Sequence, residues 1–170
     1  RQYVRNILIY LVALLCIIAF IALFSNSLEI FDEVKGTWNI YKVNAYLGYK
    51  TTTSGVIYKG ATGPIFGYII PLLIGIVLIV ESFKKSWSGY LKVMNTVFAV
   101  ILFFCVLFVL LTKEIFLDTN SLGQTPIIRN GVGPRLCAAS VAIGAIILLF
   151  ATWFPWKADL HFIDRENENN

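Results

Sequence analysis

The sequence predicts an all-α integral membrane protein with four transmembrane helices and a small β-hairpin-like first extracytoplasmic loop. Four apolar runs, at about residues 7–24, 64–80, 93–112 and 136–156, come close to the roughly 20 residues that a helix needs to cross a bilayer. Charged residues make up 14% of the chain and hydrophobic residues 58%, whereas a soluble domain carries about 25% charged residues. We therefore expect residues 1–170 to form a single four-span membrane domain.

The first apolar run follows Arg1 and Arg5, and such a basic start is also typical of secretory signal peptides. The run is about 18 residues long, which exceeds the roughly 7 to 15 residues of a signal-peptide core. We therefore expect a retained first helix. The third run contains no glycine or proline, and its bulky side chains on every face favour contact with lipid.

Small residues recur at helical spacing in the second and fourth runs. In lipid, helices associate where small side chains let the backbones approach, so we expect the second and fourth spans to pack through these residues, within the chain or onto a partner. The second run also contains Pro71, which predicts a kink or a break because proline lacks a backbone N–H. The predicted small packing residues are Gly63, Gly67, Gly75, Ala138, Ala142 and Gly144.

The first loop, residues 25–63, has a strand-like composition. Residues 37–46 and 56–60 are rich in β-branched and aromatic residues, and turn-forming residues lie between them. We expect a hairpin or a sheet of two to three strands, which must lean on the second loop (residues 113–135), the membrane surface or another protein because an isolated hairpin is marginal. The residues most suited to contacts in this loop are Trp38, Tyr41 and Tyr46.

The distribution of basic residues predicts the orientation. Four spans place both termini on one side, where the short loop 81–92 and the tail hold basic residues at a higher density than the two longer loops. The positive-inside rule therefore favours cytoplasmic termini, and we expect a plasma-membrane protein. Aromatic residues at the same predicted interface act as anchors at headgroup level. These anchors are Trp87, Tyr90, Trp153 and Trp156.

No catalytic or metal-binding pattern accompanies the four runs. The sequence has no P-loop, GxSxG, HExxH or CxxC motif and no charged residue at mid-span, so we expect no catalytic residue, metal or cofactor. Glu81 is expected to be a solvated interface residue beside Lys84, and Asn95 to form a local or interhelical hydrogen bond. The three cysteines are expected to be small packing residues within spans.

The layout is similar to that of claudins, with four spans, a long first outward loop of strand character and a tryptophan, Trp38, in that loop. The claudin loop also carries two cysteines after the tryptophan, and this chain has none there. The resemblance is one of topology and carries over no functional residue.

These observations favour a non-catalytic tetraspan protein that acts as an accessory or scaffold subunit of a larger membrane complex. The expected partners are the lipid bilayer and another membrane protein or a second copy of the chain. Nucleic acid is not expected, because the basic residues are scattered and form no stripe. The alternative is a small transporter, channel or lipid-handling protein that works as a homo-oligomer, with Pro71, Gly75 and Asn95 lining a path.

Overall fold

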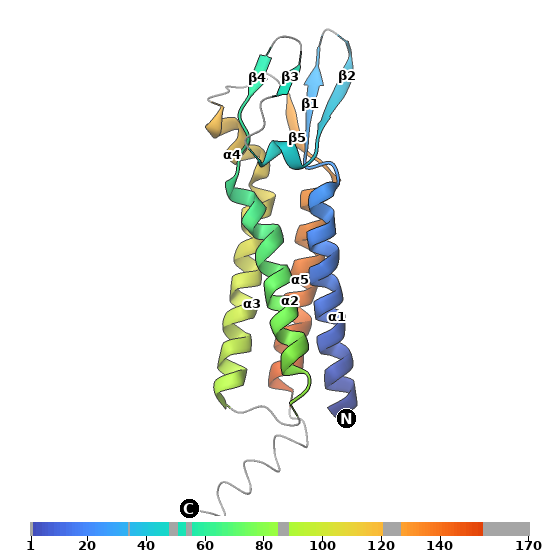
Figure 1. The fold of residues 1–170 in the computed structure, drawn as a ribbon, viewed down its shortest axis with the longest axis vertical. Helices are drawn as coiled ribbons and strands as arrows, with labels where there is room; N and C mark the ends of the chain where they lie inside the picture. Colours follow the sequence, from blue (N-terminus) through green and yellow to red (C-terminus); the bar gives the residue numbers. More distant parts are fainter. Residues whose placement is uncertain are drawn as a thin grey trace, which may run out of the picture.

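The computed structural model is an elongated bundle of four long helices with β-strands at one end (Figure 1). It describes residues 2–33, 35–47, 51–53, 56–84, 89–120 and 127–154. We call the end with the strands the sheet end. The other end, where α1 and α3 begin and α2 and α5 end, is called the base. The bundle helices are α1 (Gln2–Ile21), α2 (Phe66–Glu81), α3 (Gly89–Leu110) and α5 (Val132–Trp153).

Four helices are long and apolar enough to cross a bilayer, as the sequence predicts. With the short 3-10 turns that extend α1 and α2, the candidate spans are Val4–Phe24, Gly63–Glu81, Gly89–Leu110 and Val132–Trp153, of 19 to 22 residues each. At 1.5 Å per residue, such lengths match the roughly 30 Å of a hydrocarbon core. The helices therefore fit a multi-pass integral membrane protein, with ends a few residues from the expected ones.

The helices form a ring in which α2 and α5 lie diagonally opposite each other. α1 packs against α2 and α5, and α3 packs against the same two helices. Buried residues recur every three or four positions on each helix, which is the period of a single inward-facing side. Of the four spans, α3 is the least buried and α5 the most, in agreement with the expected lipid-facing character of the third run.

The glycines of α2 bring it close to two different neighbours. A Cβ at Gly67 would overlap the side chain of Val109 on α3, and a Cβ at Gly75 would lie 3.1 Å from the Cβ of Cys16 on α1. The close neighbours of Gly67 and Gly75 within the chain are therefore α3 and α1. The reason is the ring order, which places α1 and α3 between α2 and α5.

Of the kink or break expected at Pro71, the break does not occur, and a neighbouring helix supplies a donor for the carbonyl that proline leaves without one. α2 runs unbroken from Phe66 to Glu81 with Pro71 inside it. Proline has no N–H, so the carbonyl of Gly67, four residues earlier, loses its intrahelical donor. The thiol of Cys137 on α5 donates to that carbonyl at 3.8 Å. Cys137 thus compensates the missing bond across the bundle.

Both loops contribute to one antiparallel sheet at the sheet end. Its strand order is β2 (Thr37–Tyr41), β1 (Leu28–Asp32) and β5 (Ile128–Asn130), so β1 pairs on both sides. A separate hairpin consists of β3 (Thr51–Thr53) and β4 (Val56–Tyr58). Of the three supports expected for the first loop, the structure shows the second loop, because β5 supplies the third strand. β1 itself lies outside residues 37–46 and 56–60, which the sequence predicts to be strand-like.

A small apolar cluster joins the sheet to the bundle. One face of β1 carries Leu28 and Ile30, which pack with Tyr41, Ile128 and Phe116 of the short helix α4 (Thr112–Thr119). Buried and partly exposed residues alternate along β1, as expected for a strand with one covered face. The sheet is therefore held by its own hydrophobic core and does not depend on a partner for cover on this face.

The junction between β5 and α5 makes the closest backbone contact between the two loops. Gly131 N–H donates to the Ser27 carbonyl at 3.2 Å, and Gly133 N–H donates to the Asn26 carbonyl at 2.8 Å. A Cβ at Gly133 would lie 2.7 Å from the Ala22 carbonyl oxygen, so only glycine fits without displacement. These contacts join the end of the first span to the start of the fourth.

We predict that Gly133→Ala lowers the free energy of unfolding by about 1 to 3 kcal/mol, because overpacking against a backbone carbonyl forces a local shift. Chemical denaturation of the detergent-solubilised protein measures this quantity. Gly89→Ala is the matched control, because a Cβ there meets no atom within 4 Å. Equal stability of the two variants would contradict the close contact.

Candidate functional site

The described residues contain no cluster of three or more histidine, cysteine and acidic side chains of the kind that holds a metal ion. Cys16, Cys105 and Cys137 are free and buried in the bundle core, which agrees with the packing role expected from the sequence. The features of the structure that can carry a function are therefore its surfaces, its grooves and its buried polar groups.

A hydroxyl network at the sheet end ties the first loop to the bundle. The Tyr46 hydroxyl lies 2.8 Å from that of Tyr68 on α2 and 3.3 Å from that of Thr112 at the start of α4. Thr112 also donates to the Val109 carbonyl at 2.6 Å. Burial raises the pKa of Tyr46, so the phenol keeps its proton at neutral pH and remains able to donate.

Burial removes two of the predicted contact residues from the surface. Tyr41 and Tyr46 are buried within the chain and are not available to a partner. Trp38 stays partly exposed on β2. Sequence composition alone could not separate these roles, because it depends on which face of the folded loop each aromatic residue occupies.

The outer face of the three-stranded sheet is a surface that lies outside the candidate spans. Side chains alternate between faces along a strand, so Glu29 on β1, Trp38 and Ile40 on β2, and Arg129 on β5 share this face. Arg129 forms an ion pair with Glu29, and its guanidinium lies 3.8 Å from the centre of the Trp38 ring. Ile40 is 52% exposed beside them.

A hollow of about 250 Å³ continues the outer face toward the membrane. It lies between β5 and the first turn of α5, and Arg129 and Arg135 are among its lining residues, with Glu29 as the acidic one. The outer face thus combines an exposed aliphatic residue, a half-buried tryptophan and two guanidinium groups. Tryptophan and arginine are the residues most enriched at the energetic centres of protein interfaces.

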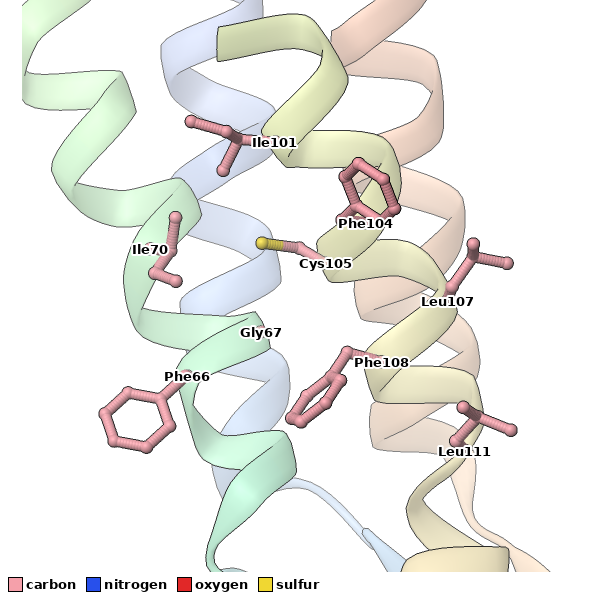
Figure 2. Close-up of a pocket in the computed structure, with 9 residues that line it drawn as sticks. All are labelled: Phe66, Gly67, Ile70, Ile101, Phe104, Cys105, Leu107, Phe108 and Leu111. Carbon is pink, nitrogen blue, oxygen red and sulfur yellow. The ribbon is translucent and has the colours of Figure 1, made fainter. Parts of the chain in front are cut away.

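A second hollow, an apolar groove of about 380 Å³, lies between α2 and α3 near the sheet end. Figure 2 shows side chains of the two helices facing each other across it, with Ile70 on one side and Ile101 and Cys105 on the other. Phe66 and Phe108 lie toward one end of the groove, and Gly67 contributes no side chain to it. A groove of this lining accepts an apolar chain or side chain.

The predicted aromatic anchors lie at the base where they are described. Tyr90 is 78% exposed near the start of α3, and Trp153 is 57% exposed at the end of α5. The Trp153 indole donates to the Thr96 hydroxyl at 2.8 Å, which joins α5 to α3. Trp87 and Trp156 lie outside the described residues.

Two polar residues depart from their expected environment. Glu81, expected to be solvated beside Lys84, is only 4% exposed, and neither carboxylate oxygen accepts a hydrogen bond. Asn95, expected to form a hydrogen bond, is fully buried and its amide makes none. The reason is that Glu81 and Asn95 occupy inward-facing positions of their helices, which only the packed bundle reveals.

Comparisons with known proteins identify no family for this chain. The chain matches no protein-family model, no curated protein and no solved structure. Function therefore has to be argued from the surfaces and buried groups of this chain alone.

We predict that Tyr46→Phe destabilises the protein by about 1 to 2 kcal/mol, because it leaves the buried Tyr68 and Thr112 hydroxyls without a partner at that point. Thermal or chemical unfolding in detergent measures the change. Tyr90→Phe is the control, because Tyr90 is highly exposed. If both variants unfold like the wild type, the hydroxyl network does not hold the loop.

Proposed function

We propose that this chain is a non-catalytic accessory or scaffold subunit of a plasma-membrane complex, with both termini in the cytoplasm. The observation that carries the proposal is the outer face of the sheet, where Ile40, Trp38 and Arg129 lie together and accessible. The partner is a second membrane protein whose extracellular part offers apolar and acidic groups to this face.

The free edge of β2 supports the proposal. Within the described residues β2 pairs with β1 alone, so its other edge can receive a strand from a partner. Soluble proteins usually protect such an edge with charge, proline or a covering element. Here Ile40, on the edge strand itself, remains exposed.

The orientation in the proposal follows from charge. Arg5, Lys84 and Lys92 lie near the base, and basic residues are retained on the cytoplasmic side of multi-pass proteins. The sheet then faces the outside. Partner contact within the membrane uses the exposed side of α3, where Val97, Phe104 and Leu107 project away from the bundle core.

We predict that a photo-reactive phenylalanine analogue at Ile40 cross-links a specific membrane protein in the native membrane, because an exposed residue on the binding edge touches the partner directly. Mass spectrometry of the purified adduct identifies the product. The control places the same analogue at Glu114, which is exposed on α4 at the same end of the molecule.

A single stoichiometric adduct at Ile40 and none at Glu114 is the expected result. Ile40→Lys should then reduce co-purification of that partner at least tenfold, since a buried unpaired ammonium costs several kcal/mol at an interface. The same weak background at both positions, with the chain purifying alone, would overturn the subunit proposal.

The groove between α2 and α3 favours a second function, the handling of a lipid within the bilayer. Its lining is apolar, and about 380 Å³ holds roughly a dozen methylene groups, so an acyl chain fits. The groove lies among the candidate spans, where acyl chains are the surrounding solvent.

We predict that a phospholipid with a photo-reactive acyl chain labels Phe66, Phe104 and Phe108 more strongly than the exposed α1 residues Leu14 and Ile17, because a groove holds a chain longer than a convex surface does. Reconstituted protein and peptide mapping measure the ratio. Equal labelling of the two sets of residues would remove the lipid-handling alternative.

A further inference from the structure

The base of the bundle contains a layer of buried polar side chains that the proposed function does not use. Three helices each place one polar residue at an inward-facing position there: Glu81 on α2, Asn95 on α3 and Thr152 on α5. All three are at least nine-tenths buried. About one turn closer to the middle of each helix, the inward-facing side chains are apolar: Leu78, Ala99 and Leu148. The polar residues therefore form a distinct layer at the base.

These side chains lack hydrogen-bond partners. Neither carboxylate oxygen of Glu81 makes a hydrogen bond, and the same holds for both polar atoms of the Asn95 amide and for the Thr152 hydroxyl. Burial acts most strongly on the Glu81 carboxylate; the Asn95 amide lies beside it without closing a hydrogen bond of normal geometry, and the Lys84 ammonium acts on it as well. Trp153, next to Thr152, donates to Thr96, next to Asn95, so the turns of α5 and α3 that carry the layer lie together.

Among the described residues, no basic side chain hydrogen-bonds to the Glu81 carboxylate, although the Arg5 side chain on α1 is fully buried at the same end. Lys84 is exposed, so water screens its charge. On α1, the Arg5 guanidinium donates to the Lys84 carbonyl at 3.3 Å. On α3, Lys92 lies nearly a turn before Asn95, and the described end of α5 carries no ionisable side chain. Isolated burial of a carboxylate costs several kcal/mol, so a positive charge at the oxygens themselves stabilises it.

The oxygen atoms of these three side chains suit the binding of a small cation. A carboxylate, an amide carbonyl and a hydroxyl supply oxygen ligands, which hard metal cations prefer over nitrogen or sulfur, and the carboxylate is also the one group of the three that can take up a proton. One carboxylate balances one positive charge, and the other acidic residues that the structure describes belong to β1, the turn after it and α4, at the sheet end. We propose that Glu81, Asn95 and Thr152 form a binding position for one monovalent cation, a proton or a sodium ion, that enters from the aqueous phase at the base.

Carbodiimide labelling of the reconstituted wild-type protein tests this site. Dicyclohexylcarbodiimide modifies carboxyl groups that carry a proton in an apolar environment, and peptide mass spectrometry locates the adduct. We expect Glu81 to be labelled near neutral pH at least tenfold faster than the exposed Glu114. Protection by sodium but not by potassium identifies a sodium site, whereas protection only at raised pH identifies a proton site.

Variants test whether the three side chains act together. The measured quantity is the concentration of sodium, or of hydroxide, that halves the rate of Glu81 labelling. Asn95→Ala and Thr152→Val should each change this concentration by about tenfold, which is the effect of losing one ligand or hydrogen bond. Ser82→Ala is the matched control, because the Ser82 hydroxyl already donates to the Ile79 carbonyl at 2.6 Å. Glu81→Gln should abolish labelling at this peptide.

Labelling of Glu81 at the same rate as Glu114 would overturn the proposal, since it would mean a solvated and ionised carboxylate. Labelling that neither sodium nor raised pH prevents would overturn it as well. These readouts use the wild-type chain and do not depend on the partner of the proposed complex, so the two proposals fail independently.

Discussion

The structure depends on the backbone contact between the end of the first span and the start of the fourth. Gly131 and Gly133 donate to the carbonyls of Ser27 and Asn26, so the polypeptide entering β1 and the polypeptide entering α5 leave the bundle side by side. β1 can then pair with β5 on one edge and β2 on the other. Without this contact the two loops would have separate and marginal structures, because a two-stranded hairpin rarely persists alone. Backbone approach at this distance requires residues without a Cβ.

The bundle core has an apolar middle and a polar layer at each end. At the sheet end the layer is satisfied, because Tyr46, Tyr68 and Thr112 hydrogen-bond to one another. At the base Glu81 and Asn95 are equally buried but make no hydrogen bonds. In a low-dielectric core a satisfied network adds rigidity, whereas an unsatisfied group raises the free energy until it acquires a ligand or a proton. The two ends therefore have different physical roles: the hydroxyl network at the sheet end holds the first loop, and the polar layer at the base is the proposed cation position.

Local sequence patterns predict much of this architecture, and their failures have identifiable causes. The four helices follow from the length of the apolar runs, and the second loop's support of the first follows from the weakness of an isolated hairpin. β1 lies outside the residues predicted to form strands, because Ser25–Asn26–Ser27 and the acidic residues that follow are typical of a polar segment where a chain leaves the membrane. Of the kink or break expected at Pro71, the break does not occur, and Cys137, distant in sequence, reaches the carbonyl that proline leaves without a donor. Tyr41 is buried because Phe116 of α4 and Ile128 of β5 cover that face of the first loop, whereas Tyr46 is buried because it enters the bundle core beside Tyr68.

The sequence by itself determined the class of the protein: the apolar runs have no central charge, and the free energy of transferring them to hydrocarbon depends on composition and length alone. It also determined which residues could pack closely, since glycine and alanine are small in any context. Only the tertiary structure decided which helices meet at those residues, which aromatic side chains of the first loop remain accessible, and that Glu81, Asn95 and Thr152 share one buried layer. Each of these depends on the order of helices around the ring and on contacts between residues far apart in the chain, and local periodicity carries no information about either.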